Sequence, residues 1–185
     1  MLPNVSFIET GFAGLIEIVP RVFPDDRGHF FESYRSEWNS YLGSDLSFVQ
    51  ENQSFSRKGV IRGLHFQRPP YAQAKLVRVI EGKVLDVVVD LRRDSATFGK
   101  TYSVVLDGQK NNQLLVPEGF AHGLAALEDS IFFYKCSNVY HKESELGIRW
   151  NDPALRIQWP FENPIVSEKD EVLPTLQELI INSVI

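Results

Sequence analysis

The segment from Arg62 to Lys75 holds the residues of this chain that are best suited to chemistry. It places His65 at the end of an extended run, follows it with a proline-rich turn signal, and opens a second β-rich run with Lys75. A histidine titrates near neutral pH and a lysine carries a fixed charge. Pointing into one cavity from adjacent strands, the two would suit proton abstraction from a carbon acid. A hairpin with one buried histidine and a surface lysine explains this segment alone equally well.

The elements that must position these residues are short β-strands. Apolar and β-branched runs alternate with turn signals such as Asp25–Gly28, Glu81–Gly82 and Asp107–Gly108. This punctuation predicts a mostly β fold, a jelly-roll sandwich or barrel with a few short helices. The predicted strands are Leu15–Val22, Phe48–Phe55, Gly59–Phe66, Leu76–Glu81, Val84–Leu91, Thr101–Leu106, Gln113–Val116, Gly123–Ala126, Ile131–Val139 and Leu155–Gln158.

Helical patterns are confined to two short segments. Ser33–Leu42 is compatible with one helix, and Pro174–Val184 predicts a second at the C-terminus because Leu176, Leu179 and Val184 recur at helical spacing. No internal repeat or interdomain linker interrupts the chain, so residues 1–185 are expected to form a single domain.

Strand alternation raises two points about side-chain direction. In Ile131–Val139 the side chain of Tyr134 shares a face with two apolar neighbours, which on its own favours a core tyrosine. In a regular strand Arg62 and His65 would project to opposite faces. A bulge at Gly63 would bring both to one site, and otherwise Arg62 would serve another part of the site or a neighbouring subunit.

Composition narrows the functional class. The 185 residues are 43% hydrophobic and 23% charged, which is ordinary for a globular protein, and the net charge of −5 argues against a nucleic-acid partner. The single cysteine, Cys136, cannot form a disulfide within the chain, which is typical of proteins from a reducing compartment. Its apolar surroundings in the sequence favour a packing role in the core. Residues 1–20 do not have the pattern of a signal peptide, and no apolar run is long enough to span a membrane. We therefore expect a cytoplasmic protein without a membrane partner.

The segment Pro117–Gly123 resembles the second conserved motif of the cupin superfamily, whose fold is a jelly-roll barrel. Metal-binding cupins carry a His-x-His pair in their first motif, but the matching residues here are His65, Phe66 and Gln67. Only His65 and His122 remain as candidate ligands, and zinc or iron sites need at least three. We therefore expect no metal.

Ordered blocks between Val22 and Pro174 resemble the dTDP-4-dehydrorhamnose 3,5-epimerase family of metal-free cupins. The blocks are Phe23–Glu32, Phe48–Asn52, Gly59–Gln67, Gln73–Val77, Val89–Arg92, Ala96–Gly99, Gly119–Gly123, Tyr134–Cys136, Glu145–Ile148, Trp150–Pro153 and Ser167–Asp170. The resemblance implies a cofactor-independent isomerase that inverts C3 and C5 of dTDP-4-dehydro-6-deoxy-D-glucose through enolates. It also implies a homodimer in which the partner's N-terminal region completes each site.

The same resemblance assigns roles to particular residues. His65 would be the base, Asp170 the carboxylate that orients it, Lys75 the cation at the ketone oxygen, and Tyr134 the proton donor across the ring. Arg27, Arg62 and Lys169 would face the dTDP portion, and Phe23 and Phe30 would stack on thymine. The full set of implied substrate-contacting positions is Phe23, Arg27, Phe30, Glu32, Gln50, Glu51, Asn52, Arg62, His122, Tyr140, Glu145 and Lys169.

Two alternatives stay open at this point. A monofunctional 3- or 5-epimerase of another deoxysugar would keep the same base and lysine, and a non-catalytic cupin could bind nucleotide sugars without turning them over. Leu124 stands where many relatives have phenylalanine, and this smaller side chain could alter how the sugar sits.

Overall fold

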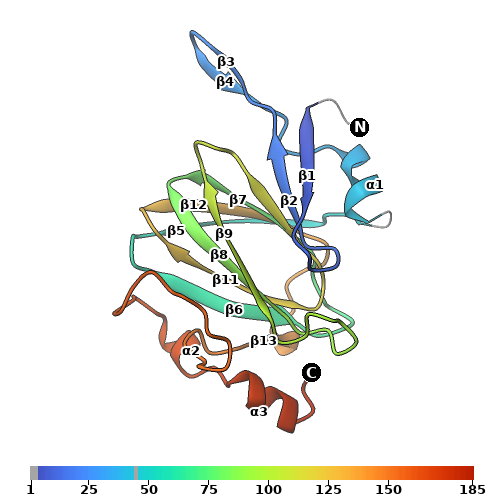
Figure 1. Cartoon of the computed structure of the whole chain (residues 1–185), viewed down its shortest axis with the longest axis vertical. Helices are drawn as coiled ribbons and strands as arrows, with labels where there is room; N and C mark the ends of the chain where they lie inside the picture. The colour runs from blue at the N-terminus through green and yellow to red at the C-terminus, as the bar shows by residue number, and fades with distance from the viewer. Residues whose placement is uncertain (1–3, 44–45) are drawn as a thin grey trace.

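A computed structural model describes residues 4–43 and 46–185, and it shows two antiparallel β-sheets packed face to face (Figure 1). Within these residues one sheet has six strands in the order β1-β2-β10-β7-β12-β5, and the other has five in the order β13-β6-β11-β8-β9. The expected jelly-roll sandwich is confirmed. The strands of the larger sheet are β1 (Val5–Glu9), β2 (Ile16–Pro20), β5 (Gln50–Ser56), β7 (Lys75–Glu81), β10 (Gln113–Val116) and β12 (Ser130–Cys136). Those of the smaller sheet are β6 (Ile61–Gln67), β8 (Lys83–Asp90), β9 (Thr101–Asp107), β11 (Phe120–Ala126) and β13 (Glu145–Gly147).

The predicted strand at Leu155–Gln158 is wrong. This segment is irregular, and Arg156 has a φ of 51°, a left-handed conformation that an extended strand cannot contain. Sequence analysis also missed the strands β1 and β13 and the hairpin of β3 (Phe23–Asp25) and β4 (Gly28–Phe30). Each of these strands has five residues or fewer, which is too short for an alternating apolar and polar pattern to be recognised.

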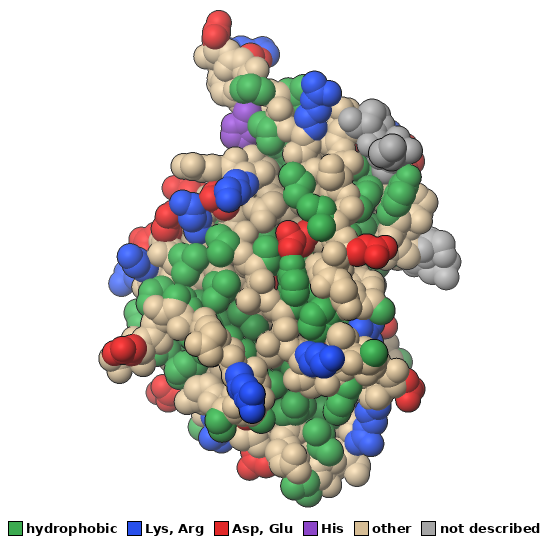
Figure 2. Space-filling view, viewed as in Figure 1, with side chains coloured by type: hydrophobic (Ala, Val, Ile, Leu, Met, Phe, Trp, Pro, Cys, Tyr) green, Lys and Arg blue, Asp and Glu red, His purple; other side chains and the backbone are tan. Residues whose placement is uncertain are grey.

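The β3–β4 hairpin projects away from the body of the molecule (Figure 1). In Figure 2 it stands out from the surface, with charged side chains at its far end. Its turn coincides with the predicted turn signal at Asp25–Gly28, and the two strands pair only with each other. An isolated two-stranded hairpin is marginally stable in water.

The helices are short and lie at the edges of the sandwich. The predicted helix at Ser33–Leu42 is only partly formed, as a 3₁₀ turn η1 (Ser36–Trp38) followed by α1 (Asn39–Leu42). At the C-terminus α3 (Leu176–Ile181) confirms the second prediction, and a capping box between Thr175 and Glu178 begins it. The turn η2 (Lys142–Ser144) and helix α2 (Glu168–Glu171) were not predicted. No helix of the described residues is long and apolar enough to cross a membrane.

Three apolar clusters hold these layers together. Val77 and Val88 belong to the cluster between the two sheets, while Leu64 and Leu179 belong to one beneath the C-terminal segment. Trp38 anchors a third cluster, which covers the outer face of the larger sheet. Burying such side chains contributes roughly 1.5–3 kcal/mol each.

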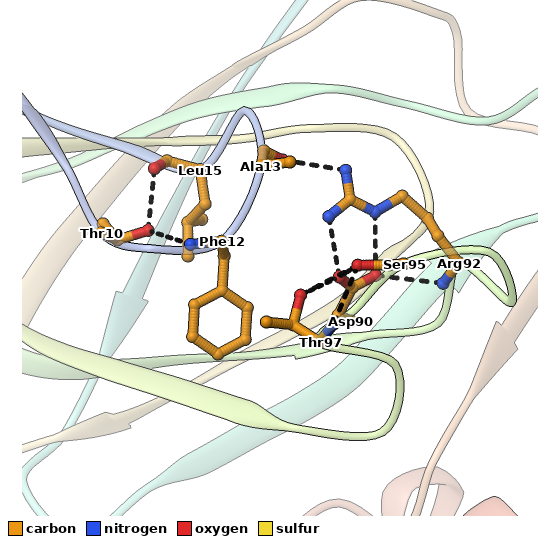
Figure 3. Close-up of polar contacts among 8 residues, drawn as sticks. All are labelled: Thr10, Phe12, Ala13, Leu15, Asp90, Arg92, Ser95 and Thr97. Carbon is orange, nitrogen blue, oxygen red and sulfur yellow. Dashed lines mark hydrogen bonds and ion pairs between the residues drawn. The ribbon is translucent and has the colours of Figure 1, made fainter.

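A charged cluster fixes the chain before β2 to the end of β8 (Figure 3). The Asp90 carboxylate is fully buried and accepts hydrogen bonds from the Arg92 guanidinium and from the hydroxyls of Ser95 and Thr97. Arg92 also donates to the carbonyl of Ala13 at 2.8 Å, which ties the 10–15 loop to the sandwich. This cluster lies outside the cavity described next.

Candidate active site

A polar cavity lies between the two sheets. It has two adjoining lobes of about 280 Å³ each, and both are lined by His65, Lys75 and Tyr134. His65 comes from β6 of the smaller sheet, whereas Lys75 on β7 and Tyr134 on β12 come from the larger one. The histidine therefore faces the lysine and the tyrosine from the opposite wall.

His65 is held by a buried carboxylate. Its Nε2 lies 2.7 Å from Oδ1 of Asp170, whose Oδ2 accepts a hydrogen bond from the backbone N–H of Gly63. Ser167 caps α2, and its hydroxyl accepts a hydrogen bond from the backbone N–H of Asp170. Burial alone would raise the pKa of Asp170, but the hydrogen bonds from His65 and Gly63 hold it below its ordinary value. Because a carboxylate only accepts, His65 donates from Nε2 and keeps Nδ1 for other partners.

The opposite wall supplies a proton donor and a cation. Burial raises the pKa of Tyr134, so its phenol keeps a proton at neutral pH. Burial lowers the pKa of Lys75, and the nearby Cys136, Asp86 and Glu145 oppose that shift. Within residues 4–43 and 46–185 no hydrogen bond or ion pair occupies the Lys75 ammonium, which leaves it available to a ligand oxygen.

A β-bulge brings Arg62 into the same site as His65. On β11 the step from His122 to Leu124 spans two residues, but their partners on β6, His65 and Arg62, are three apart. The extra residue adjoins Gly63, which is the first of the two alternatives that the sequence left open, and both Arg62 and His65 line the second lobe. The Arg62 guanidinium donates to the Ser56 hydroxyl at 2.8 Å, which fixes its direction.

His122 carries its own buried carboxylate. Its Nε2 lies 3.0 and 2.9 Å from the two oxygens of Asp86, and His122 lines the second lobe. Sequence analysis singled out His122 but gave Asp86 no role. The available signal was the charge of Asp86 between the apolar residues of Val84–Val89 in β8, a pattern that indicates a buried polar group with a partner.

A connected set of polar side chains lines the first lobe. The side-chain amide of Gln50 donates to the side-chain oxygen Oδ1 of Asn52 at 3.1 Å, and the Tyr140 hydroxyl donates to the Glu145 carboxylate at 2.8 Å. Glu145 also pairs with Lys169 at 2.6 Å. Two further lining residues, Gln67 and Gln73, were not singled out from the sequence, because isolated glutamines carry no distinctive pattern.

Five of the predicted substrate contacts do not line this cavity. Glu51 points to the outer face of the larger sheet, where it pairs with Lys135, because alternation directs it away from Gln50 and Asn52. The other four belong to the projecting hairpin or the residues just after it. They are Phe23, Arg27, Phe30 and Glu32.

The described residues contain no group of three or more histidine, cysteine, aspartate or glutamate side chains that could hold a metal ion. The two cavity histidines each direct Nε2 to a carboxylate instead. The absence of a metal from the functional protein stays a prediction.

Comparison with known proteins assigns the chain to a family. The family model for dTDP-4-dehydrorhamnose 3,5-epimerase matches residues 9–178. A dTDP-4-dehydrorhamnose 3,5-epimerase from Escherichia coli K12 is 49% identical over 179 residues, covering 95% of this chain and 97% of that protein. The chain belongs to the dTDP-4-dehydrorhamnose 3,5-epimerase family.

Solved structures of this epimerase family match the whole fold. An epimerase from Legionella pneumophila, solved in complex with dTDP-4-keto-L-rhamnose, is 42% identical with a TM-score of 0.90 and covers 94% of each chain. A 3'-monoepimerase from Streptomyces bikiniensis, in complex with dTDP-quinovose, is 32% identical with a TM-score of 0.89. It covers 95% of this chain and 90% of its own. The fold is therefore shared by relatives described as epimerising different sets of centres.

Proposed function

We propose that this protein inverts C3 and C5 of dTDP-4-dehydro-6-deoxy-D-glucose to give dTDP-4-dehydro-L-rhamnose, in the biosynthesis of dTDP-L-rhamnose. One observation carries the proposal: a carboxylate-held histidine faces a lysine and a protonated tyrosine across one cavity. A ketone flanked by two C–H groups needs a base, a partner for the enolate oxygen and an acid on the other face.

The first half of each inversion is proton removal. Nδ1 of His65 takes the proton from the carbon next to the ketone. The C–H electron pair forms the enolate double bond, and negative charge moves to the C4 oxygen. The Lys75 ammonium stabilises that oxygen, and a positioned donor of this kind lowers a barrier by about 3 kcal/mol. Asp170 stabilises the imidazolium that forms on His65.

The second half returns a proton to the opposite face. Tyr134 gives its phenolic proton to the same carbon, and the ketone re-forms as the configuration inverts. Support comes from the walls of the cavity, since β6 and β12 belong to different sheets. Solvent then resets the imidazolium and the phenolate to their starting protonation states, so no cofactor is consumed.

The nucleotide is proposed to bind along the polar lining of both lobes. Arg62 and Lys169 line the second lobe and suit pyrophosphate oxygens, as guanidinium and ammonium groups do in general. Gln50, Asn52 and Tyr140 line the first lobe and offer amide and aromatic contacts.

We also propose a homodimer in which the β3–β4 hairpin of one subunit completes the site of the other. Phe23 and Phe30 are 38% and 69% exposed, and neither touches the cavity of its own chain. Exposed aromatics on a projecting hairpin suit a partner's nucleotide site, where base stacking contributes about 1–3 kcal/mol. Assembly in the cytoplasm fits the single, buried and unpaired cysteine.

A monofunctional 3-epimerase is the second candidate, because the similar Streptomyces bikiniensis protein is described as a 3'-monoepimerase. Incubation with dTDP-4-dehydro-6-deoxyglucose in D2O, followed by NMR, separates the two. Deuterium at both C3 and C5 supports the 3,5-epimerase, with the product checked by a rhamnose-forming reductase. Label at one carbon would indicate the monofunctional enzyme, and no label at either would contradict epimerase activity on this substrate.

A further inference from the structure

Asp86 is a carboxylate placed inside an apolar core. It lies on β8 between Val84 and Val88, which belong to the cluster between the sheets, and its side chain is fully buried. Among the described residues its only side-chain partner is His122. Burying a carboxylate that has a single histidine as its side-chain partner is strongly unfavourable for folding. Its presence here therefore indicates a role in the active site rather than in stability.

Asp90, on the same strand, shows what a structural carboxylate looks like in this fold. It is equally buried, but a guanidinium and two hydroxyls satisfy it, and it ties a loop to the sandwich (Figure 3). Asp86 holds no loop. Its partner is a histidine that lines the cavity.

The contact with Asp86 fixes the tautomer of His122. A carboxylate only accepts hydrogen bonds, so the His122 proton resides on Nε2, and Nδ1 is the nitrogen left for a ligand. His122 and His65 are direct partners across β11 and β6. Two carboxylate-held imidazoles thus stand side by side on the wall opposite Lys75.

Asp86 also influences Lys75. Burial lowers the pKa of that ammonium, and the groups that oppose the shift are Cys136, Asp86 and Glu145. Burial raises the pKa of the Cys136 thiol, which is therefore neutral near pH 7, and Lys169 already neutralises Glu145. The lobes are also lined by the Asp170 carboxylate, which is hydrogen-bonded to His65, and by the cations of Arg62 and Lys169. Of the three groups that oppose the shift, Asp86 is therefore the anion without a lysine or arginine partner.

We propose that Asp86 is a positioning residue for epimerisation: it fixes the ring of His122 toward the sugar, and it places a negative charge behind the lobe in which Lys75 would meet the enolate oxygen. This inference rests on the proposed function, because it assumes that Lys75 meets a developing oxyanion. It adds to that function a group that never touches the substrate.

The test compares Asp86→Asn with Asp90→Asn, an equally buried carboxylate on the same strand but outside the cavity. For Asp86→Asn we expect kcat to fall about 10²-fold with little change in KM. The alkaline limb of kcat/KM should move to lower pH, because Lys75 loses a negative charge that opposes the effect of burial on its pKa. Asp90→Asn should lose stability but keep the wild-type pH profile. If the Asp90→Asn protein does not fold, Thr97→Val serves as the control instead, because it removes only one hydrogen bond to Asp90.

A second variant separates the two roles of Asp86. His122→Gln keeps the carboxylate, so kcat should fall while the alkaline limb stays at the wild-type pH. An unshifted limb in Asp86→Asn, or equal shifts in the Asp86 and Asp90 variants, would overturn the inference.

A measurement without substrate keeps this inference separable from the proposed function. In ¹⁵N-histidine NMR spectra, assigned with the His122→Gln variant, wild-type His122 should carry its proton on Nε2, and Asp86→Asn should lose that preference. A protein that shows this tautomer change but no turnover of the dTDP sugar would contradict the proposed function alone. An unchanged tautomer would sink the role of Asp86 even in an active enzyme.

Discussion

At the scale of single residues, the proposed mechanism separates proton removal from proton return. His65 and Tyr134 lie on opposite sheets, and the raised pKa of Tyr134 keeps on its phenol the proton that its proposed step requires. A base on one face and an acid on the other produce inversion, whereas a single group would return the proton to the face it came from.

This separation predicts different outcomes for two conservative variants. His65→Asn should abolish deuterium uptake from D2O at both carbons and lower turnover by about 10³-fold or more, since it removes the base. Tyr134→Phe should still take up deuterium, through reversible enolate formation at His65, but should form little inverted product. NMR of the sugar reports both quantities in one sample. Rapid inversion by Tyr134→Phe would show that another group donates the proton.

At the scale of elements, the bulge in β6 decides which side chains reach the cavity. Gly63 has a φ of 99°, and a Cβ there would lie 2.6 Å from the His122 carbonyl oxygen and 2.7 Å from Gly123 Cα. The close approach of β6 and β11 leaves no room for a side chain. Glycine at this point therefore supports the position of Arg62 relative to His65.

Substitution of this glycine should be costly. Gly63→Ala combines an unfavourable φ with a backbone clash, and we expect a loss of about 3 kcal/mol or more in the free energy of unfolding. Gly59→Ala is the matched control, because Gly59 has a φ of 90° and nothing within 4 Å of the added Cβ. Its loss should be about 1 kcal/mol. Urea denaturation measures both, and equal losses would show that the clash relaxes away.

At the scale of the whole molecule, the site is proposed to be shared between two copies of the chain. Mixing a protein that carries Arg27→Ala and Phe30→Ala with one that carries His65→Asn tests this directly. Each variant alone should be nearly inactive. A mixed dimer contains one site with an intact base and an intact hairpin, so equal mixing and subunit exchange should restore about a quarter of wild-type activity. Light scattering checks that the species is a dimer, and no recovery in confirmed mixed dimers would contradict a hairpin supplied by the partner.

The Asp90 cluster should make global stability depend on acid pH. Burial alone would raise the pKa of Asp90, but hydrogen bonds from Arg92, Ser95 and Thr97 hold it well below its ordinary value. A carboxyl whose folded pKa is lowered stabilises the fold above its unfolded pKa, about 4, and this contribution is lost as pH falls toward the folded value. Asp90→Asn should therefore be much less stable than wild type at pH 7, with a difference that narrows below about pH 4 in denaturant titrations. A difference independent of pH would show that the charge of Asp90 does not matter.

Much of this protein is determined by local sequence. Period-2 runs bounded by turn signals predict the strands, because alternation and turn chemistry act over a few residues. The ordered blocks around His65, Lys75, Tyr134 and Asp170 predict the family, and with it the residues that now line the cavity, since each block is itself local. Leu155–Gln158 failed as a strand because its apolar side chains pack on the sheet from an irregular segment.

Only the tertiary structure showed that Asp86 meets His122. These residues are 36 apart in the sequence, and no local pattern encodes their contact. The contact of Asp170 with His65 spans 105 residues, and it was expected from the family resemblance rather than from any local pattern. The position of the β3–β4 hairpin, outside the body of its own chain, likewise follows from where the sheets end. Residue types set the possible chemistry of this site, and the packing of the two sheets determines which charges face each other in the cavity.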